Sequence, residues 1–329
     1  MKEIFNELID HRSLTKDSAR SVLVELASGK YNTSQMAAFM TVYMMRSITV
    51  DELQGFRDAM LELCVPARFE QPVMDVCGTG GDGKNTFNMS TLSSFVVAAA
   101  GQPVAKHGNY GVSSACGSSN LLEFFGYKFT NNMDVLRRSL DAANICFMHA
   151  PLFHPAMKNV APIRKELGVK TFFNMLGPMV NPSFPTRQLV GVFNLELARQ
   201  YGYLYQNTDK SFVILHSLDG YDEVSLTGPF KYFFNGGEKI IEPADLGLPR
   251  LSHDDIKGGQ TVEESAKVFM NILEGKGSAA QQAAVVANAG MALYTAEQKL
   301  GIKVAVSKAT EALASGKALQ AFKRLMEVN

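Results

Sequence analysis

Residues 75 to 119 constrain the fold of this 329-residue chain more than any other stretch. An apolar, strand-like segment at residues 73–77 runs into a glycine-rich loop at residues 78–83, and a helical pattern follows. A second apolar segment, residues 104–106, runs into another loop rich in glycine and serine. Strand, loop and helix in alternation predict an α/β sheet that binds ligands at the carboxyl ends of its strands.

The chemistry of the two loops indicates an anion, and a phosphate in particular. Glycines adopt positive φ and allow successive backbone N–H groups to converge on a ligand. Ser90 and Thr91 directly precede the helical pattern, and free N–H groups at a helix start favour negative charge. Lys106 and His107 open the second loop. The pair of loops therefore predicts two walls of one phosphate site, although either loop alone could be an ordinary turn.

Neither loop is a standard nucleotide motif. Gly78, Gly83 and Lys84 have the spacing of a P-loop, but Asn85 stands where that motif needs a hydroxyl for Mg²⁺. Gly78-x-Gly80-x-x-Gly83 also has the dinucleotide spacing, which is a weak signal by itself.

Composition and charge argue against several classes of protein. The 32 basic and 32 acidic residues cancel, which argues against a protein that binds nucleic acid through bulk charge. No apolar run reaches membrane-spanning length, and the first residues lack a signal-peptide pattern. Four scattered cysteines without a Cys-x-x-Cys motif are typical of a reducing compartment. We expect a cytoplasmic protein with no membrane or nucleic-acid partner.

The periodicity predicts two domains. Residues 1–65 show four helical patterns and form a helical domain, which we expect helices from about residues 155–180 to join. The third pattern, near residues 36–44, is apolar almost all round, so we expect it to be buried. Thr49 and Glu52 form a capping box at the start of the fourth. Residues 70–329 form the α/β domain.

Three later segments carry local expectations. Residues 154–168 read as one basic helix, residues 174–182 as an irregular turn, and residues 308–328 as one helical segment. Further strands are expected at residues 188–192 and 212–216, with a hairpin at residues 232–237, and further helices at residues 195–207, 261–273 and 279–296.

Asp222 and Glu223 are adjacent carboxylates in a turn after a predicted strand. Mg²⁺ takes a few carboxylates and bridges to substrate phosphates, so the pair could hold Mg²⁺ with Ser90 adding a hydroxyl. A solvated acidic turn is the alternative. Arg164 could bind a carboxylate with its guanidinium fork, or lie on a helix surface. His107 and His154 are not assigned as general bases.

Eight segments together resemble the anthranilate phosphoribosyltransferase family and occur in family order over about residues 70–230. They are Gly78-Thr79-Gly80-Gly81-Asp82, residues 85–91 (NTFNMST), Lys106-His107-Gly108-Asn109, His154-Pro155-Ala156-Met157, residues 164–168 (RKELG), residues 173–178 (FNMLGP), Asn181-Pro182 and residues 219–223 (DGYDE). The resemblance implies a small helical domain and a larger α/β domain with a mostly parallel sheet, of the nucleoside phosphorylase/phosphoribosyltransferase type. It also implies a cleft between them and a homodimer formed through the helical domain.

The same resemblance implies Mg²⁺-dependent transfer of phosphoribose from 5-phosphoribosyl-1-pyrophosphate (PRPP) to the amine of anthranilate, in tryptophan biosynthesis. The residues implied for PRPP are Gly78, Gly81, Asp82, Thr86, Asn88, Ser90, Thr91, Lys106 and Ser118. Those implied for Mg²⁺ are Ser90, Asp222 and Glu223, and those for anthranilate are Gly78, Asn109 and Arg164. No general base is required, because the aromatic amine is already neutral at pH 7 and pyrophosphate leaves readily once its charge is neutralised.

Three residues depart from the family pattern: Tyr110 where Arg is common, Phe153 where a first His is common, and Cys77 where an aliphatic residue is usual. Tyr110 and Phe153 bear on the acceptor, so a different aromatic amine is an open alternative. A pyrimidine nucleoside phosphorylase and a non-catalytic nucleic-acid-binding relative are the rivals. The paired carboxylates argue against the first, and the zero net charge against the second.

Overall fold

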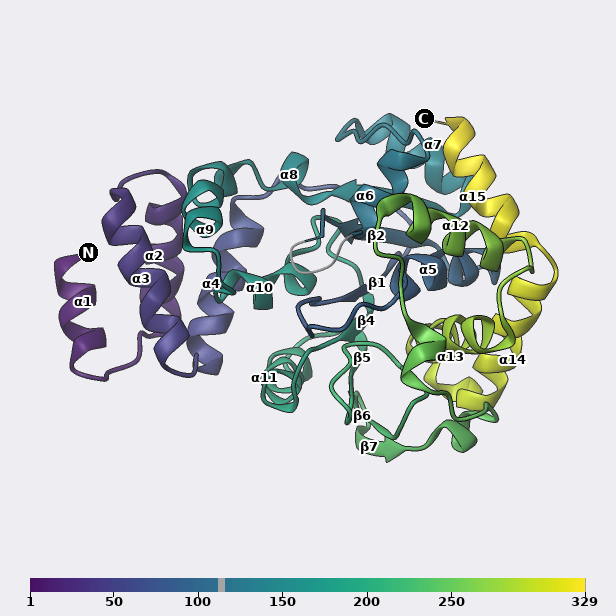
Figure 1. Ribbon diagram of the computed structural model, residues 1–329. Helices are drawn as coiled ribbons and strands as arrows, with labels where there is room; N and C mark the ends of the chain where they lie inside the picture. Colours follow the sequence, from purple (N-terminus) through teal and green to yellow (C-terminus); the bar gives the residue numbers. More distant parts are fainter. Residues whose placement is uncertain (112–115, 329) are drawn as a thin grey trace. The chain divides into compact units, whose positions relative to one another are not determined.

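The computed structural model describes residues 1–111 and 116–328, which form two compact units (Figure 1). Unit 1 comprises Met1–Pro66 and Ala150–Phe184. Unit 2 takes the described part of residues 67–149 and 185–329. The chain therefore leaves the second unit once, after residue 149, and returns to it at residue 185.

Unit 1 is entirely helical. Its helices are α1 (Lys2–Ile9), α2 (Lys16–Ala27), α3 (Thr33–Met45), α4 (Val50–Glu62), α8 (Ala150–Phe153), α9 (Ala161–Leu167) and α10 (Phe173–Leu176), with 3₁₀ turns at Pro155–Asn159 and Gly177–Val180. The capping box predicted for α4 is confirmed: Glu52 N–H donates to Thr49 Oγ1 at 3.2 Å, and Thr49 N–H donates to Glu52 Oε2 at 3.0 Å.

Aromatic rings form the centre of unit 1. Phe39 and Tyr43 of α3 meet Phe56 of α4 edge-on, and Phe172 stacks on Phe56 with ring centroids 4.5 Å apart. The expectation that residues 36–44 are buried is wrong at the carboxyl end, because Met44 is 42% exposed and the next residue, Met45, is 83% exposed. The apolar stripe of α3 is therefore divided between the core and an open surface.

Unit 2 contains a seven-stranded sheet in the order β3-β2-β1-β4-β5-β6-β7. The strands are β1 (Met74–Gly78), β2 (Val104–Gly108), β3 (Ile145–His149), β4 (Arg187–Gly191), β5 (Ser211–Ser217), β6 (Phe230–Phe234) and β7 (Gly237–Ile241). The first five in that order pair in parallel and the last two are antiparallel. This confirms a mostly parallel sheet. Chain order reverses between β1 and β4, which is where such sheets bind ligands.

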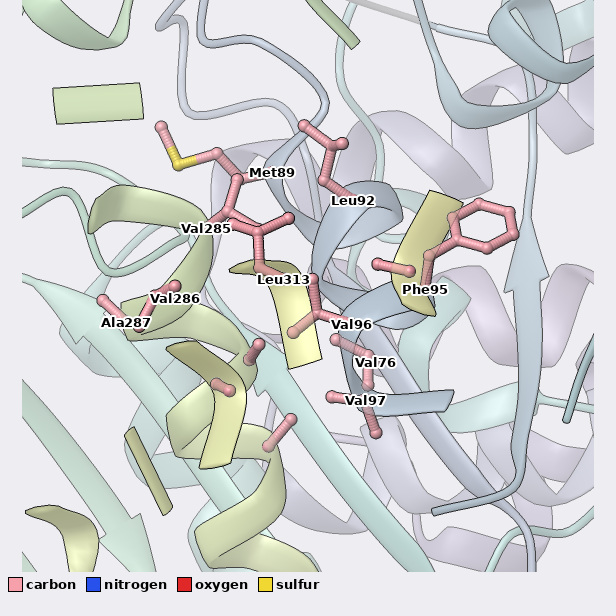
Figure 2. Packing of buried hydrophobic residues seen from close by; sticks show 14 of the residues in the cluster. Val76, Met89, Leu92, Phe95, Val96, Val97, Val285, Val286, Ala287 and Leu313 are labelled. Carbon is pink, nitrogen blue, oxygen red and sulfur yellow. The ribbon is translucent and has the colours of Figure 1, made fainter. Parts of the chain in front are cut away.

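Helices cover both faces of this sheet. They are α5 (Met89–Ala99), α6 (Ser118–Phe124), α7 (Met133–Ala143), α11 (Leu195–Gln206), α12 (Val262–Leu273), α13 (Ala279–Ala296), α14 (Ile302–Ala314) and α15 (Lys317–Val328), with 3₁₀ turns at Pro243–Leu246, His253–Ile256 and Gln298–Leu300. Val76 of the sheet faces the apolar cluster that α5 and α13 build (Figure 2). Because strand side chains alternate, Asp75 and its neighbour Gln188 face the other side, where α11 supplies Tyr205.

Three local expectations are corrected. Residues 154–168 form a 3₁₀ turn and then α9, since Pro162 has no N–H to continue one helix and suits the start of another. Residues 174–182 form α10 and a 3₁₀ turn rather than an irregular loop. The segment 308–328 is divided between α14 and α15 because Gly316 takes φ +75°.

None of the helices in the part of the chain described is both long and apolar enough to cross a membrane.

Candidate functional site

The carboxyl ends of β1 and β4 meet where Gly78 pairs with Gly191, at the reversal of strand order. The segment after β5 crosses this point so closely that side chains are excluded. A Cβ on Gly191 would lie 1.4 Å from the backbone oxygen of Asp222, and one on Gly78 would lie 2.6 Å from Asp222 Oδ2. The two glycines therefore allow the predicted acidic pair to reach the sheet.

The Asp222 carboxylate is bound by the first glycine loop. Its Oδ2 accepts the N–H of Gly80 at 2.7 Å, and Asp222 N–H donates to Asp82 Oδ2 at 3.4 Å. Gly80 and Gly81 both take positive φ, +63° and +74°, which turns the loop toward this carboxylate. Asp222 is 6% exposed, so the alternative of a solvated acidic turn is wrong.

Glu223 reaches the amino end of α5. Its Oε1 accepts the N–H of Ser90 at 2.9 Å, and its Oε2 accepts the hydroxyl of Thr86 at 3.4 Å. The helix begins at Met89, three residues earlier than the sequence pattern suggests, so Ser90 and Thr91 lie in its first turn. Free N–H groups at that turn stabilise negative charge.

Burial disfavours the ionised form of these two carboxyl groups. It raises the pKa of Asp222 to about 7, helped by the nearby charge of Asp82. Burial and the charge of Asp222 raise the pKa of Glu223 well above its ordinary value, while Lys106 acts in the opposite sense. No cluster of three or more His, Cys, Asp or Glu side chains suited to a metal occurs among the described residues. Two carboxylates whose ionised form is disfavoured gain from a nearby cation, so the pair still fits Mg²⁺, which takes its remaining ligands from water and phosphate.

The second loop is tied to the first. Asn88, at the start of α5, donates its Nδ2 to the backbone oxygen of Cys116 at 2.9 Å. Asn109 is exposed, and its backbone oxygen accepts the Ser118 hydroxyl at 3.3 Å at the start of α6. Residues 112–115 of this loop lie outside the described residues.

Lys106 is less open to a ligand than its loop position suggests. It is 2% exposed, and its Nζ donates to the backbone oxygen of Val76 at 2.6 Å. Burial lowers its pKa, and the charge of Asp75 opposes that effect. Lys106 therefore links β2 to β1 directly beneath the glycine loop.

Arg164 belongs to unit 1, whereas every other predicted site residue belongs to unit 2. It lies in the last turn of α9, with its guanidinium 5.2 Å from the ring centroid of Phe173. His154 is also in unit 1 and is 5% exposed, and its Nε2 lies 3.0 Å from the backbone oxygen of Val180. Burial lowers the pKa of His154 to about 4, so the ring is neutral at pH 7.

The three departures from the family pattern have structural roles. Tyr110 is 39% exposed, donates its hydroxyl to Glu123 Oε1 at 3.2 Å and contacts the His149 ring edge-on. Phe153 is fully buried in unit 1 and is a packing residue. Burial raises the pKa of the Cys77 thiol well above its ordinary value, so it is not a reactive thiolate.

Two residues near the acidic pair are not among the predicted site residues. Asn288 of α13 binds both backbone groups of Val224: its Oδ1 accepts the N–H at 2.9 Å and its Nδ2 donates to the oxygen at 3.0 Å. Lys84 lies with Nζ 4.8 Å from the ring centroid of Tyr221. The one sequence hint for Asn288 is that it is the single amide in the otherwise apolar run 283–293.

Known proteins resemble the chain over its whole length. A family description, "Glycosyl transferase family, a/b domain", matches residues 70–319, and "Glycosyl transferase family, helical bundle domain" matches residues 2–64. The anthranilate phosphoribosyltransferase of Christiangramia forsetii is 58% identical, covering 100% of this chain and 99% of its own. That of Flavobacterium johnsoniae is 60% identical, covering 100% of both.

Solved structures resemble the fold as well. The crystal structure of anthranilate phosphoribosyltransferase from Thermus thermophilus has a TM-score of 0.91 at 33% identity, covering 98% of each chain. The enzyme from Saccharomyces cerevisiae, solved in complex with PRPP and Mg, has a TM-score of 0.91 at 24% identity, covering 98% of this chain and 96% of its own.

Proposed function

This chain belongs to the anthranilate phosphoribosyltransferase family, and we propose that it transfers the phosphoribosyl group of PRPP to the amine of anthranilate, with release of pyrophosphate. The observation that carries the proposal is the acidic pair, Asp222 and Glu223, bound by backbone N–H groups at the reversal of strand order. This is a tryptophan-biosynthesis reaction, and full-length relatives at 58% and 60% identity support it.

We propose that the two loops bind PRPP through groups that neutralise its charge. The residues are those expected from the sequence: Gly78, Gly81, Asp82, Thr86, Asn88, Ser90, Thr91, Lys106 and Ser118. Contacts among Asp82, Thr86, Ser90 and the acidic pair support one shared site. Because a carboxylate repels phosphate, we propose that Asp82 orients the loop and the sugar hydroxyls of PRPP rather than its phosphates.

We propose that Ser90, Asp222 and Glu223 hold Mg²⁺. The fit is supported by the buried Asp222 and the half-buried Glu223. Burial and the charge of Asp82 raise the pKa of Asp222, and burial and the charge of Asp222 raise that of Glu223. When bound, Mg²⁺ neutralises the charge that develops on the departing pyrophosphate. The chain's own part is to keep the carboxylates in place: Gly80 N–H and Ser90 N–H each bind one of them.

We propose that Arg164 binds the carboxylate of anthranilate, together with Gly78 and Asn109. Support comes from a guanidinium that has no carboxylate partner in the described parts of the chain. The amine needs no general base before it attacks, and the neutral, hydrogen-bonded His154 is not required as one. Positioning and electrostatics then supply most of the rate.

Anthranilate fluorescence, followed with PRPP and Mg²⁺ and with an EDTA control, tests the function. We expect Mg²⁺-dependent loss of the signal with an equal amount of pyrophosphate released. The double variant Asp222→Asn with Glu223→Gln should lose this turnover. Binding of PRPP without loss of anthranilate would instead indicate a different aromatic amine as acceptor, the alternative that Tyr110 leaves open.

We further propose a homodimer formed through unit 1 and a location in the cytoplasm. Ile9 of α1 and Met45 of α3 are 70% and 83% exposed, which supports an apolar contact surface. All four cysteine side chains are thiols, which supports a reducing compartment. Light scattering of the wild type and of Met45→Glu tests the dimer: a monomeric variant is expected, and a wild type that is itself a monomer would contradict it.

A further inference from the structure

Residues 164–174 position the Arg164 guanidinium through contacts made within this segment. Gly168 ends α9 with φ +63° and donates its N–H to the backbone oxygen of Arg164 at 3.3 Å. The chain then turns at Thr171, and this turn brings Phe173 and Asn174 to the same guanidinium. All of these contacts are made within unit 1.

The Asn174 side chain is fixed before it meets the arginine. Its backbone N–H donates to the Thr171 oxygen at 3.0 Å, and its Oδ1 accepts the Thr171 N–H at 3.1 Å. The same Oδ1 accepts Nη2 of Arg164 at 3.4 Å. The amide oxygen is thus held by the turn and offers Arg164 a long, neutral hydrogen bond, which is weaker than one to a charged acceptor.

The Phe173 ring is equally constrained. It is 5% exposed and stacks on Phe172 with centroids 4.3 Å apart, and Phe172 in turn stacks on Phe56 of α4. The guanidinium of Arg164 lies over the Phe173 ring, 5.2 Å from its centroid. A rigid aromatic platform positions a cation without neutralising its charge.

Arg46, in the same unit, is an arginine that pairs with a carboxylate. Its guanidinium lies 4.6 Å from the centroid of the Tyr43 ring, and it is also paired with the Glu52 carboxylate. That carboxylate raises the pKa of Arg46, whereas burial alone lowers the pKa of Arg164. Both arginines have an aromatic ring, but where Arg46 has a carboxylate, Arg164 has the amide of Asn174.

We propose that Asn174 is a positioning residue for the acceptor: its neutral amide orients Arg164 and leaves the positive charge available for the acceptor's carboxylate. This inference rests on the proposed function, in which that carboxylate belongs to anthranilate. A partly buried cation that is oriented but not paired with a carboxylate gains more from an incoming anion than one already in an ion pair, because the ligand does not have to displace an internal partner.

The decisive variant is Asn174→Asp, compared with Asn174→Ala. Aspartate has the same shape and keeps an oxygen for both Thr171 and Arg164, so a purely structural role predicts that it is the milder change. The proposal predicts the reverse, because the new carboxylate would pair with Arg164 as Glu52 pairs with Arg46. We expect KM for anthranilate to rise at least ~10-fold in Asn174→Asp and less in Asn174→Ala, with KM for PRPP within ~2-fold of wild type.

A second readout separates charge from structure. The preference for anthranilate over 2-aminobenzamide, which lacks the carboxylate charge, should fall ~10-fold in Asn174→Asp and change less in Asn174→Ala. Arg164→Ala should remove this preference. A larger loss of anthranilate affinity in Asn174→Ala than in Asn174→Asp, or an unchanged preference in Asn174→Asp, would overturn the proposal. A wild-type protein that turns over PRPP with another amine, but not anthranilate, would overturn the proposed function instead.

Discussion

The Oδ2 atom of Asp222 accepts a hydrogen bond from the backbone N–H of Gly80 across 142 residues of sequence, at 2.7 Å. This contact joins the first glycine loop to the acidic pair, two features that the sequence displays separately. It exists because Gly78 and Gly191 end neighbouring parallel strands and leave room for the Asp222 backbone. The loop therefore has an anion-binding backbone whose contact in this structure is one of the chain's own carboxylates.

Asp222→Asn is expected to stabilise the metal-free protein at pH 8 while lowering Mg²⁺-dependent turnover. The folded pKa of Asp222, about 7, lies above its ordinary value of 3.8. A carboxyl with a raised folded pKa contributes stability that is fully present below pH 3.8 and is lost as pH rises through 7. Over that interval the loss is of the order of a few kcal/mol. Asparagine cannot ionise and can still accept the Gly80 N–H.

Thermal unfolding at pH 5.5 and pH 8, with EDTA, measures this effect. The wild type should lose several degrees of unfolding temperature between the two pH values, and the variant less. Asp141→Asn, at an exposed position on α7, is the matched control. An Asp222→Asn protein less stable than wild type at pH 8 would contradict the argument.

Gly191→Ala is expected to abolish activity although it adds one methyl group. Its Cβ would lie 1.4 Å from the Asp222 oxygen, so the acidic segment must move away from β4. A displacement of this size at a site that depends on positioning should lower kcat/KM by at least ~100-fold. Gly202→Ala is the control, because its Cβ would make an ordinary contact at 3.5 Å with Phe233. Retained Mg²⁺-dependent activity in Gly191→Ala would show that the acidic segment need not approach β4 closely.

Local patterns predicted several elements of both units. Alternation of strand, glycine loop and helix located β1, α5 and β2, and the capping motif located α4, because each depends on a few neighbouring residues. The helix split at Gly316 was not anticipated, since glycine inside a helical pattern is tolerated as often as it ends the helix.

The candidate site was predictable only in part, because its decisive contacts join distant strands. The sequence shows Asp222 and Glu223 as adjacent carboxylates, but two adjacent acidic residues are equally compatible with a solvated turn. Burial distinguishes the two interpretations, and it follows from the pairing of β1 with β4. Asn288 could not be assigned at all, because its partner Val224 lies 64 residues away.

Asn288→Leu is expected to weaken Mg²⁺ dependence without touching the carboxylates. The substitution leaves the buried N–H and oxygen of Val224 without the amide that binds both, at a cost of about 2–5 kcal/mol of stability. Because Val224 directly follows Glu223, the carboxylate loses its support, and we expect the Mg²⁺ concentration for half-maximal rate to rise ~10-fold. Thr295→Val, two turns later in α13, is the control for helix stability. An unchanged Mg²⁺ dependence in a folded Asn288→Leu protein would mean that Glu223 is positioned by other contacts.

His154 should make the protein less stable in mild acid. Its folded pKa, about 4, lies below the ordinary value of 6.5, because burial disfavours the charged ring. Between those values the unfolded chain binds a proton that the folded chain does not, so stability is fully present above pH 6.5 and falls as pH drops toward 4. Between pH 7 and pH 5 the loss amounts to about 2 kcal/mol. Urea unfolding at the two pH values should show a smaller acid loss in His154→Gln than in wild type. An equal loss in both proteins would mean that groups other than this buried ring set the acid sensitivity.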